Sequence, residues 1–311
     1  MLKAFILLCI LPGLAWGTKP TVVYLNSYHP GYRWSDMLYQ SFSNEIMAKG
    51  IEVHQHFMDS KNLETLADHH IMVKNALAYI DYYKPDVIVA ADDNASKFII
   101  EPHFKNNSIP VVFLGVNLSS SVYGYPYQNA TGIEELEGLN KLLQVVEHYT
   151  AKTRFAMLFT KTTTSQKKFQ MYQKLAPHLT AITLDDMEDL KRQILGLSQS
   201  HDFILLDTME GLAGYKETLA RDFLQKNANV PLMTVSNSSQ RLVNFGYLKV
   251  PQEQGLWAAT SVMKILDGTP AHKIPIAQNT HFQLFINQAF NDKAKAKTPN
   301  IFYNVPHVTL D

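Results

Sequence analysis

Polar segments follow the strongly apolar stretches of this sequence, and the first of them is rich in aromatic residues. Ser27 and Tyr28 end one apolar stretch, and a Pro-Gly turn then leads to Tyr32 and Trp34. Aromatic rings beside polar groups are typical of pockets that hold a small ligand. The alternative is that Tyr32 and Trp34 pack beneath the helix that follows. We interpret Ser27, Tyr28 and Trp34 as ligand contacts.

An acidic cluster, Asp92-Asp93-Asn94, follows the apolar stretch 86–91. Its carboxylates could bind an amine or a hydroxyl group of a ligand. The alternative is that Asp93 or Asn94 caps the next helix, because a side-chain oxygen at that place accepts a hydrogen bond from a free backbone N–H. The two roles can coexist, so Asp92, Asp93 and Asn94 all remain candidates for ligand binding.

Hydroxyl-bearing residues fill the segment 160–165, just before another helix. Hydroxyls and free backbone N–H groups at a helix start suit a carboxylate or a phosphate, which makes Thr162, Thr164 and Ser165 candidates. The alternative is a solvated loop with a capping residue, and the glycines of a phosphate-binding loop are missing. Four further polar residues follow apolar stretches in the same way: Asn117, Asp207, Thr208 and Asn237.

The sequence lacks the residue patterns of a catalytic or metal centre. It has 12 histidines, but neither a metalloprotease HExxH pattern nor a GxSxG nucleophile motif occurs. We therefore predict no catalytic residue, no metal site, no cofactor and no enzymatic activity. We interpret the pairs Glu134-Glu135 and Asp185-Asp186 as helix starts, where negative charge is favoured.

Apolar stretches alternate with amphipathic segments along most of the chain. The stretch 86–91 is almost continuously apolar, whereas the apolar side of 66–80 recurs every three or four residues. This alternation predicts an α/β fold of parallel strands with helices on both faces of each sheet. The polar break at 119–132 separates two such sets, so we expect two doubly wound lobes. Ligands of such sheets bind beyond the carboxyl ends of the strands, where the candidate residues lie.

Composition and charge limit the classes of function. The chain has 311 residues, enough for about two domains, and 28 basic residues balance 28 acidic ones. No excess of positive charge favours nucleic acid. Residues 1–17 combine Lys3, a short apolar run and small residues at the end, a pattern typical of a cleavable signal peptide. We expect export to the periplasm, without disulfides because Cys9 is the one cysteine of the chain.

Several segments resemble the periplasmic substrate-binding proteins of one class of ABC transporter, whose known ligands include aromatic amino acids. The resemblance is carried by 87–94, 109–117, Thr131-Gly132-Ile133, the run from Gln254 to Gly268, and Ile274-Pro275. The opening 26–34 looks more like versions that partner bacterial sensor proteins. The resemblance implies a type I-like fold whose lobes close on the ligand about a hinge, and a membrane permease or a sensor protein as partner.

The resemblance also implies three crossings between the lobes. Residues 18–131 and 249–270 would form the first lobe, and residues 132–248 and 271–311 the second. We expect a monomer that closes on an apolar or aromatic ligand side chain held by Tyr28 and Trp34. Asp93 would pair with a ligand amine. The ligand carboxylate would bind to Thr162, Thr164 or Ser165. The other polar contacts with the ligand would come from Asn117, Asp207 and Asn237.

Overall fold

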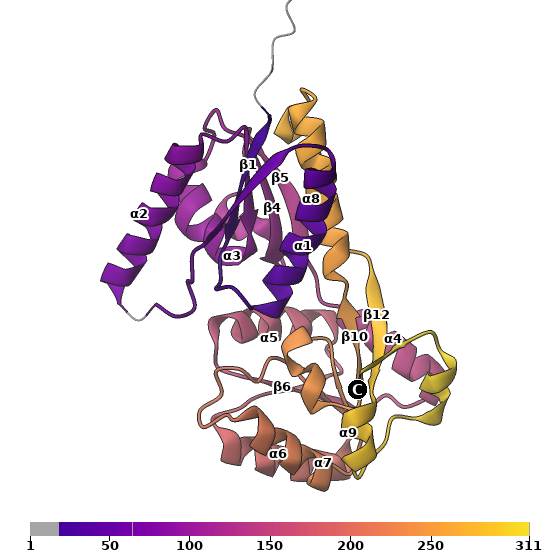
Figure 1. Ribbon diagram of the computed structural model, residues 1–311. Coiled ribbons are helices and arrows are strands. Elements are labelled where there is room, and N and C mark those ends of the chain that lie inside the picture. The colour runs from indigo at the N-terminus through magenta and orange to yellow at the C-terminus, as the bar shows by residue number, and fades with distance from the viewer. Residues whose placement is uncertain (1–18, 64, 311) are drawn as a thin grey trace, which may run out of the picture.

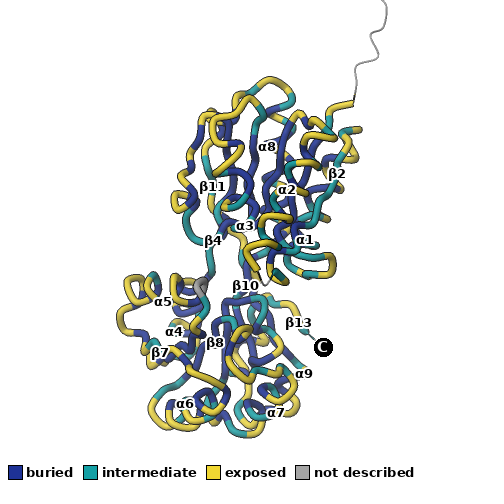
Figure 2. The backbone as a smooth tube through the Cα atoms, turned by 90° about the vertical axis from the view of Figure 1, so that its left-hand side faces the viewer, coloured by how far each residue is buried: buried dark blue, intermediate teal, exposed yellow. Residues whose placement is uncertain are grey.

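The computed structural model describes residues 19–63 and 65–310, which form two α/β lobes joined by a narrow connection (Figures 1 and 2). Each lobe is a sheet with a buried apolar layer on both faces. The predicted fold class is therefore confirmed. The predicted signal peptide, 1–17, lies outside the described residues.

Over the described residues, the first lobe has a parallel sheet of six strands in the order β11-β5-β4-β3-β1-β2. Its strands are β1 (Thr21–Asn26), β2 (Glu52–Phe57), β3 (Val87–Ala91), β4 (Val111–Asn117), β5 (Ala130–Glu135) and β11 (Ala277–Gln278). Its helices are α1 (Arg33–Ala48), α2 (Leu66–Tyr83), α3 (Asp92–Ala95), the π-helix η1 (Ser96–Phe104), α8 (Pro251–Leu266) and the short 3₁₀ turns η2 (Ser120–Tyr123) and η4 (Ala271–Lys273).

The second lobe has a sheet of seven strands within the same described ranges, in the order β13-β12-β10-β9-β8-β6-β7. Its strands are β6 (Phe155–Phe159), β7 (Thr180–Thr183), β8 (Phe203–Leu206), β9 (Leu232–Thr234), β10 (Phe245–Lys249), β12 (Phe282–Asn287) and β13 (Val308–Leu310). Its helices are α4 (Leu139–Thr150), α5 (Thr163–Leu175), α6 (Met187–Ser200), α7 (Glu217–Asn227), α9 (Gln288–Lys293) and the 3₁₀ turns η3 (Asn237–Leu242) and η5 (Asn300–Asn304).

Side chains of each central strand alternate between two apolar layers. In β1, Val23 and Leu25 pack in the layer under α2, whereas Val22 and Tyr24 pack in the layer under α1 and α8. This is the period-two geometry of a strand that is covered on both faces. The sheets are therefore fixed by apolar burial, and the polar loops at their carboxyl ends are left to contact a ligand.

Local signals in the sequence set several helix ends. A capping box between Thr65 and Asp68 begins α2, and Pro251 occupies the first turn of α8. Asp186 accepts hydrogen bonds from two backbone N–H groups at the start of α6, as predicted for that acidic pair. Gly50, with a φ of 76°, follows the end of α1.

The crossings between the lobes differ from the positions expected from the sequence. The break at 119–132 does not connect the lobes, because it leads into β5, which stays paired with β4 as far as Glu135. Likewise β11 pairs with β5, although the sequence assigns 271–311 to the second lobe. The residues before β5 have the composition of a loop, so the sequence does not reveal the strand itself. Its middle residues, Thr131-Gly132-Ile133, are buried.

The second sheet is not purely parallel, which corrects the expectation of parallel strands throughout. Strand β12 runs antiparallel to β10, between β10 and the edge strand β13. The segment that forms β10, Phe-Gly-Tyr-Leu-Lys, contains no β-branched residue. Among the described helices, none combines the length and apolarity needed to cross a bilayer.

Two glycines give a matched test of this packing. A Cβ on Gly246 would lie 2.2 Å from the carbonyl oxygen of Thr234, whereas a Cβ on Gly196, inside α6, would meet nothing within 4 Å. Gly246→Ala should destabilise the protein by about 1–3 kcal/mol, because β9 or Phe285 must move. Gly196→Ala should stabilise it by roughly 0.5–1 kcal/mol, the helix preference for alanine. Urea unfolding checks both, and an unchanged midpoint for Gly246→Ala contradicts the tight packing of β10.

Candidate ligand-binding site

A cleft with a volume of about 1170 Å³ lies between the lobes and is lined by residues of both. Its walls are the loops after β1, β3 and β4 in the first lobe and those after β6, β8 and β9 in the second. The cleft therefore opens at the carboxyl ends of both sets of strands, where the sequence places the candidate residues.

Most of the predicted contact residues line this cleft, whereas three do not. Ser27, Ser165 and Asp207 are fully buried and do not border the cleft. The side chain of Thr164 lies outside the described side chains. The predicted residues that do line the cleft are Tyr28, Trp34, Asp92, Asp93, Asn94, Asn117, Thr162, Thr208 and Asn237.

The three corrected residues hold loops in place. The Ser27 hydroxyl donates to the Ala91 carbonyl over 2.6 Å and accepts from the Ala95 N–H over 2.8 Å, which fastens the loop after β1 to the start of α3. The Ser165 hydroxyl donates to a carboxylate oxygen of Asp207. These hydroxyls have their partners inside the protein, so none is left for a ligand.

Asp92 and Asp93 both border the cleft, but Asp92 is almost fully buried. Asp92, 3% exposed and with a φ of 68°, accepts a hydrogen bond of 2.7 Å from Ser35. Burial and then the charge of Glu135 raise the pKa of Asp92 well above its ordinary value, which disfavours the ionised form. Asp93 accepts bonds from the Tyr123 hydroxyl over 2.8 Å and the Asn117 amide over 2.6 Å. Asp93 is thus held in a fixed orientation.

Neither Asp93 nor Asn94 caps a helix. Helix α3 begins at Asp92 itself, and the residue before it, Ala91, makes no side-chain cap. The Asn94 amide instead donates to the Ser60 hydroxyl over 2.7 Å. The capping alternative is therefore wrong, and both residues keep their place on the cleft wall.

Aromatic rings form the first-lobe wall of the cleft. The Tyr28 and Tyr32 rings lie 4.6 Å apart between centroids, and the ammonium of Lys61 lies 4.4 Å and 3.9 Å from them. Lys61 also donates to the Tyr32 hydroxyl over 2.7 Å. Trp34 lies in the first turn of α1, with the ammonium of Lys249 4.9 Å from its ring. This wall offers aromatic faces that already hold cations.

A buried ionic cluster joins the lobes at the back of the cleft. Lys249, at the end of β10, pairs with Glu135, at the end of β5, and with Glu137 over 3.0 Å. Lys168, in α5, pairs with Glu137 over 2.9 Å and with Asp207 over 3.1 Å. All five side chains are at most 6% exposed. We call these residues the hinge cluster.

The hinge cluster corrects one prediction and adds residues that the sequence did not single out. Glu134-Glu135 is not a helix start: Glu134 accepts from the backbone and hydroxyl of Ser120, and Glu135 ends β5. Burial raises the pKa of Glu135, although Lys249 acts in the opposite direction. Burial lowers the pKa of Lys168, but Asp207 and Glu137 outweigh it and raise that pKa well above its ordinary value.

Hydroxyls and amides form part of the second-lobe wall, which also carries Lys167 and Glu210. Thr162 is the N-cap of α5 and accepts from the Ser165 N–H, and it also faces the cleft. Thr208 accepts from the Ser238 hydroxyl over 2.9 Å. The side-chain oxygen of Asn237 is buried and has no partner among the described residues. This wall can therefore accept or donate hydrogen bonds to a ligand carboxylate or hydroxyl.

Sequence comparison places almost the whole chain in one family. Residues 29–305 match the family model described as ABC transporter substrate binding protein. This chain belongs to the ABC transporter substrate-binding protein family. Among curated proteins, no sequence relative is found.

Solved structures of similar fold include other binding proteins of this kind. A domain from Streptococcus pneumoniae in complex with L-Trp has a TM-score of 0.69 at 10% identity, covering 94% of this chain and 100% of that chain. A ligand-free, open substrate-binding protein with adhesive properties from Clostridium difficile has a TM-score of 0.70 at 13% identity, with coverage of 94% and 100%. A solute-binding protein from Agrobacterium vitis with α-D-tagatopyranose has a TM-score of 0.57 at 14% identity, with coverage of 86% and 94%. At these identities the likeness concerns the fold.

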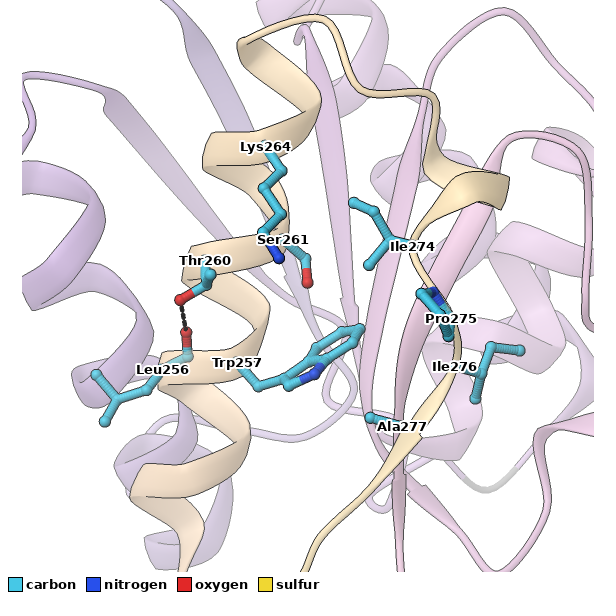
Figure 3. A pocket seen from close by; sticks show the side chains of 9 residues that line it. All are labelled: Leu256, Trp257, Thr260, Ser261, Lys264, Ile274, Pro275, Ile276 and Ala277. Carbon is cyan, nitrogen blue, oxygen red and sulfur yellow. Dashed lines mark hydrogen bonds between the residues drawn. The ribbon is translucent and has the colours of Figure 1, made fainter.

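A second hollow of this substrate-binding protein, about 450 Å³, lies on the outer side of the first lobe between α8 and the segment 274–277. Figure 3 shows the Trp257 ring between the helix and that segment, and Thr260 donates to the Leu256 carbonyl over 2.9 Å. Lys264 is its one charged lining residue, and none of the predicted contact residues borders it. The cleft between the lobes is therefore the candidate site.

The stability of the folded protein at low pH should depend on the ion pairs of the hinge cluster. Burial alone raises the pKa of Glu137, but Lys168 and Lys249 outweigh it and lower that pKa from 4.5 to about 2. Because the folded-state value is the lower one, this stabilisation is complete above about pH 4.5 and is lost as the pH falls towards about 2. Over that range the wild type should lose on the order of 3 kcal/mol more than Glu137→Gln in urea unfolding. Equal losses in the two proteins would show that Glu137 is not held by the two lysines.

Proposed function

We propose that this protein captures an aromatic amino acid between its lobes and delivers it to an ABC permease. The observation that carries the proposal is an aromatic wall beside carboxylates of the same cleft: Tyr28, Tyr32 and Trp34 share the cleft with Asp93 and Glu137. Aromatic faces favour a flat, apolar side chain, and carboxylates favour an ammonium group. An aromatic amino acid carries both groups on one small molecule.

The second-lobe wall supplies groups that can bind the ligand carboxylate. Thr162 stands at the N-terminus of α5, a helix of 13 residues. Free N–H groups and the positive end of the helix dipole attract an anion there. Ser236 and Asn237 lie on the same wall. A zwitterionic ligand would thus meet groups of opposite charge on the two sides of the cleft.

Ligand binding would close the lobes. Each lobe has its own apolar cores, so each can move as a rigid body about the connection. The ligand favours the closed state only through contacts that the open state lacks, here simultaneous contact with both walls. A closed, liganded surface is what a permease or a sensor protein would recognise.

The composition of residues 1–17 is that of a cleavable signal peptide, which supports the periplasm as the place where the mature protein would act. The chemistry required of it there is binding and release. No acid–base pair or metal is needed for that role.

Aromatic truncation tests the proposed ligand. Tyr28→Ala and Trp34→Ala should each weaken L-tryptophan binding by about tenfold in isothermal titration calorimetry, because each removes an aromatic contact worth about 1 kcal/mol beyond its area. Tyr82→Ala, at a residue 79% exposed on α2, is the matched control and should leave affinity unchanged. Unchanged affinity in both cleft variants would remove the aromatic wall from the ligand site.

Delivery is tested in cells that lack this protein. Uptake of radiolabelled L-tryptophan at low concentration should fall to the background of a permease deletion, and the wild-type gene should restore it. The Trp34→Ala gene, whose product binds weakly, should restore it incompletely. Normal uptake together with a lost transcriptional or behavioural response to the ligand would replace delivery by sensing.

A further inference from the structure

One carboxylate oxygen of the hinge cluster has no hydrogen-bond partner in the part of the chain that the structure describes. The Glu137 side chain is 2% exposed, and its Oε1 accepts from both Lys168 and Lys249, over 2.9 Å and 3.0 Å. Its Oε2 is buried and has no hydrogen-bond partner among the described residues. Glu137 nevertheless borders the cleft. The free oxygen thus belongs to a residue that is both buried and next to the ligand space.

An unpartnered charged oxygen in this environment is costly. Leaving a buried acceptor without a hydrogen bond costs about 1–3 kcal/mol, and more for a charged group. Proton uptake does not relieve the cost, because Lys168 and Lys249 keep the pKa of Glu137 at about 2 despite its burial. The protein therefore holds an anionic acceptor that would gain stability if a donor arrived from the cleft.

The surrounding charges favour a cationic donor. The hinge cluster has three carboxyl groups (Glu135, Glu137 and Asp207) but two ammonium groups (Lys168 and Lys249). A ligand carboxylate at Oε2 would meet like charge, whereas an ammonium would complete the alternation of charges. A hydrogen bond with both partners charged is about twice as strong as one between neutral groups.

Asp93, another carboxylate of the cleft wall, is less available. Both oxygens of Asp93 already accept a hydrogen bond, one from Tyr123 and one from Asn117. Glu137, in contrast, lies next to Lys249, whose ammonium faces the Trp34 ring. A ligand with its ring on the aromatic wall would therefore have its ammonium near the hinge cluster.

We infer that Glu137 anchors the ammonium group of the ligand, which restricts the ligands to α-amino acids and other primary amines, with Asp93 as a positioning residue of the wall. This assignment rests on the proposed binding function of the cleft, but it does not require the ligand to be aromatic. It differs from the expectation that Asp93 is the amine partner. The charge of Glu137 and the free position of its Oε2 are both needed.

A comparison of ligands with and without the ammonium group tests the assignment. The probes are L-tryptophan against indole-3-propionate and L-leucine against 4-methylpentanoate, each pair differing in the amine alone. Binding is measured by isothermal titration calorimetry for the wild type, Glu137→Gln, Asp93→Asn and the surface control Glu188→Gln. The wild type should prefer the amine member of a binding pair by about ten- to a hundredfold.

Glu137→Gln should reduce this preference to about twofold or less, since the amide cannot replace the charge. Glu188→Gln should keep it, and Asp93→Asn should change it much less than Glu137→Gln does. Circular dichroism melting verifies that each variant is folded at the titration temperature. Glu137→Asp, which keeps the charge but retracts the oxygen, should lose most of the preference as well and serves if Glu137→Gln is unfolded.

The outcomes separate this inference from the proposed ligand. A preference that survives in both Glu137 variants, or one that disappears in Asp93→Asn alone, overturns the assignment. Failure of every amine probe to bind also overturns it. Binding of the leucine pair with dependence on Glu137, but no binding of the tryptophan pair, would uphold the anchor and reject the aromatic ligand. Tight binding of L-tryptophan without dependence on Glu137 would do the reverse.

Discussion

Two lysines buried at the junction of the lobes determine how the rest of the molecule can be arranged. Taking an ammonium out of water costs several kcal/mol, and good geometry with carboxylates must offset that cost. Lys249 and Lys168 meet this requirement because the chain at the ends of β5 and β8 brings Glu135, Glu137 and Asp207 around them. The ends of strands from both lobes are therefore tied to one point, and a shift of either strand end would leave a buried charge unpaired.

The same point fixes where the lobes can bend. The connections between the lobes, at 136–138, 250 and 279–281, are hydrogen-bonded to each other. The Asn279 amide donates to the Leu136 carbonyl over 3.2 Å, and the Val250 N–H donates to the His281 carbonyl over 3.2 Å. Glu253 accepts from the backbone N–H groups of residues 280 and 281. A closing motion that kept these bonds would rotate the lobes about the cluster and bring the outer walls together. Contacts with ligand would then change most at the cleft mouth and least at its back.

The fold could be predicted from the sequence further than the site could. Continuous apolar stretches such as Val87–Ala91 indicate strands. Because ligands bind beyond the carboxyl ends of parallel strands, the sequence then predicts correctly that Tyr28, Asp93 and Asn117 line one cleft. This argument does not tell which side chains of a loop point into the cleft and which point into the protein. Ser27 and Asp207, which are buried in the protein, therefore could not be distinguished from residues that line the cleft. Glu137, Lys168 and Lys249 were missed because charged residues on a helix or strand end look solvated in sequence. Their pairing spans 31 and 112 positions, which no local pattern records.

The aromatic wall also limits how strongly an aromatic ligand can bind. The Lys61 ammonium already lies on the Tyr28 and Tyr32 rings, so a ligand ring that takes this place gains stacking but loses a cation–π contact. Lys61 would then need another partner. Glu210, on the second-lobe wall, has no ion pair among the described residues and already raises the pKa of Lys61 across the cleft, against the larger, lowering effect of burial. If closure brought Glu210 closer to Lys61, their attraction would offset the lost cation–π contact. Ligand binding would then favour closure of the lobes, and closure would favour ligand binding.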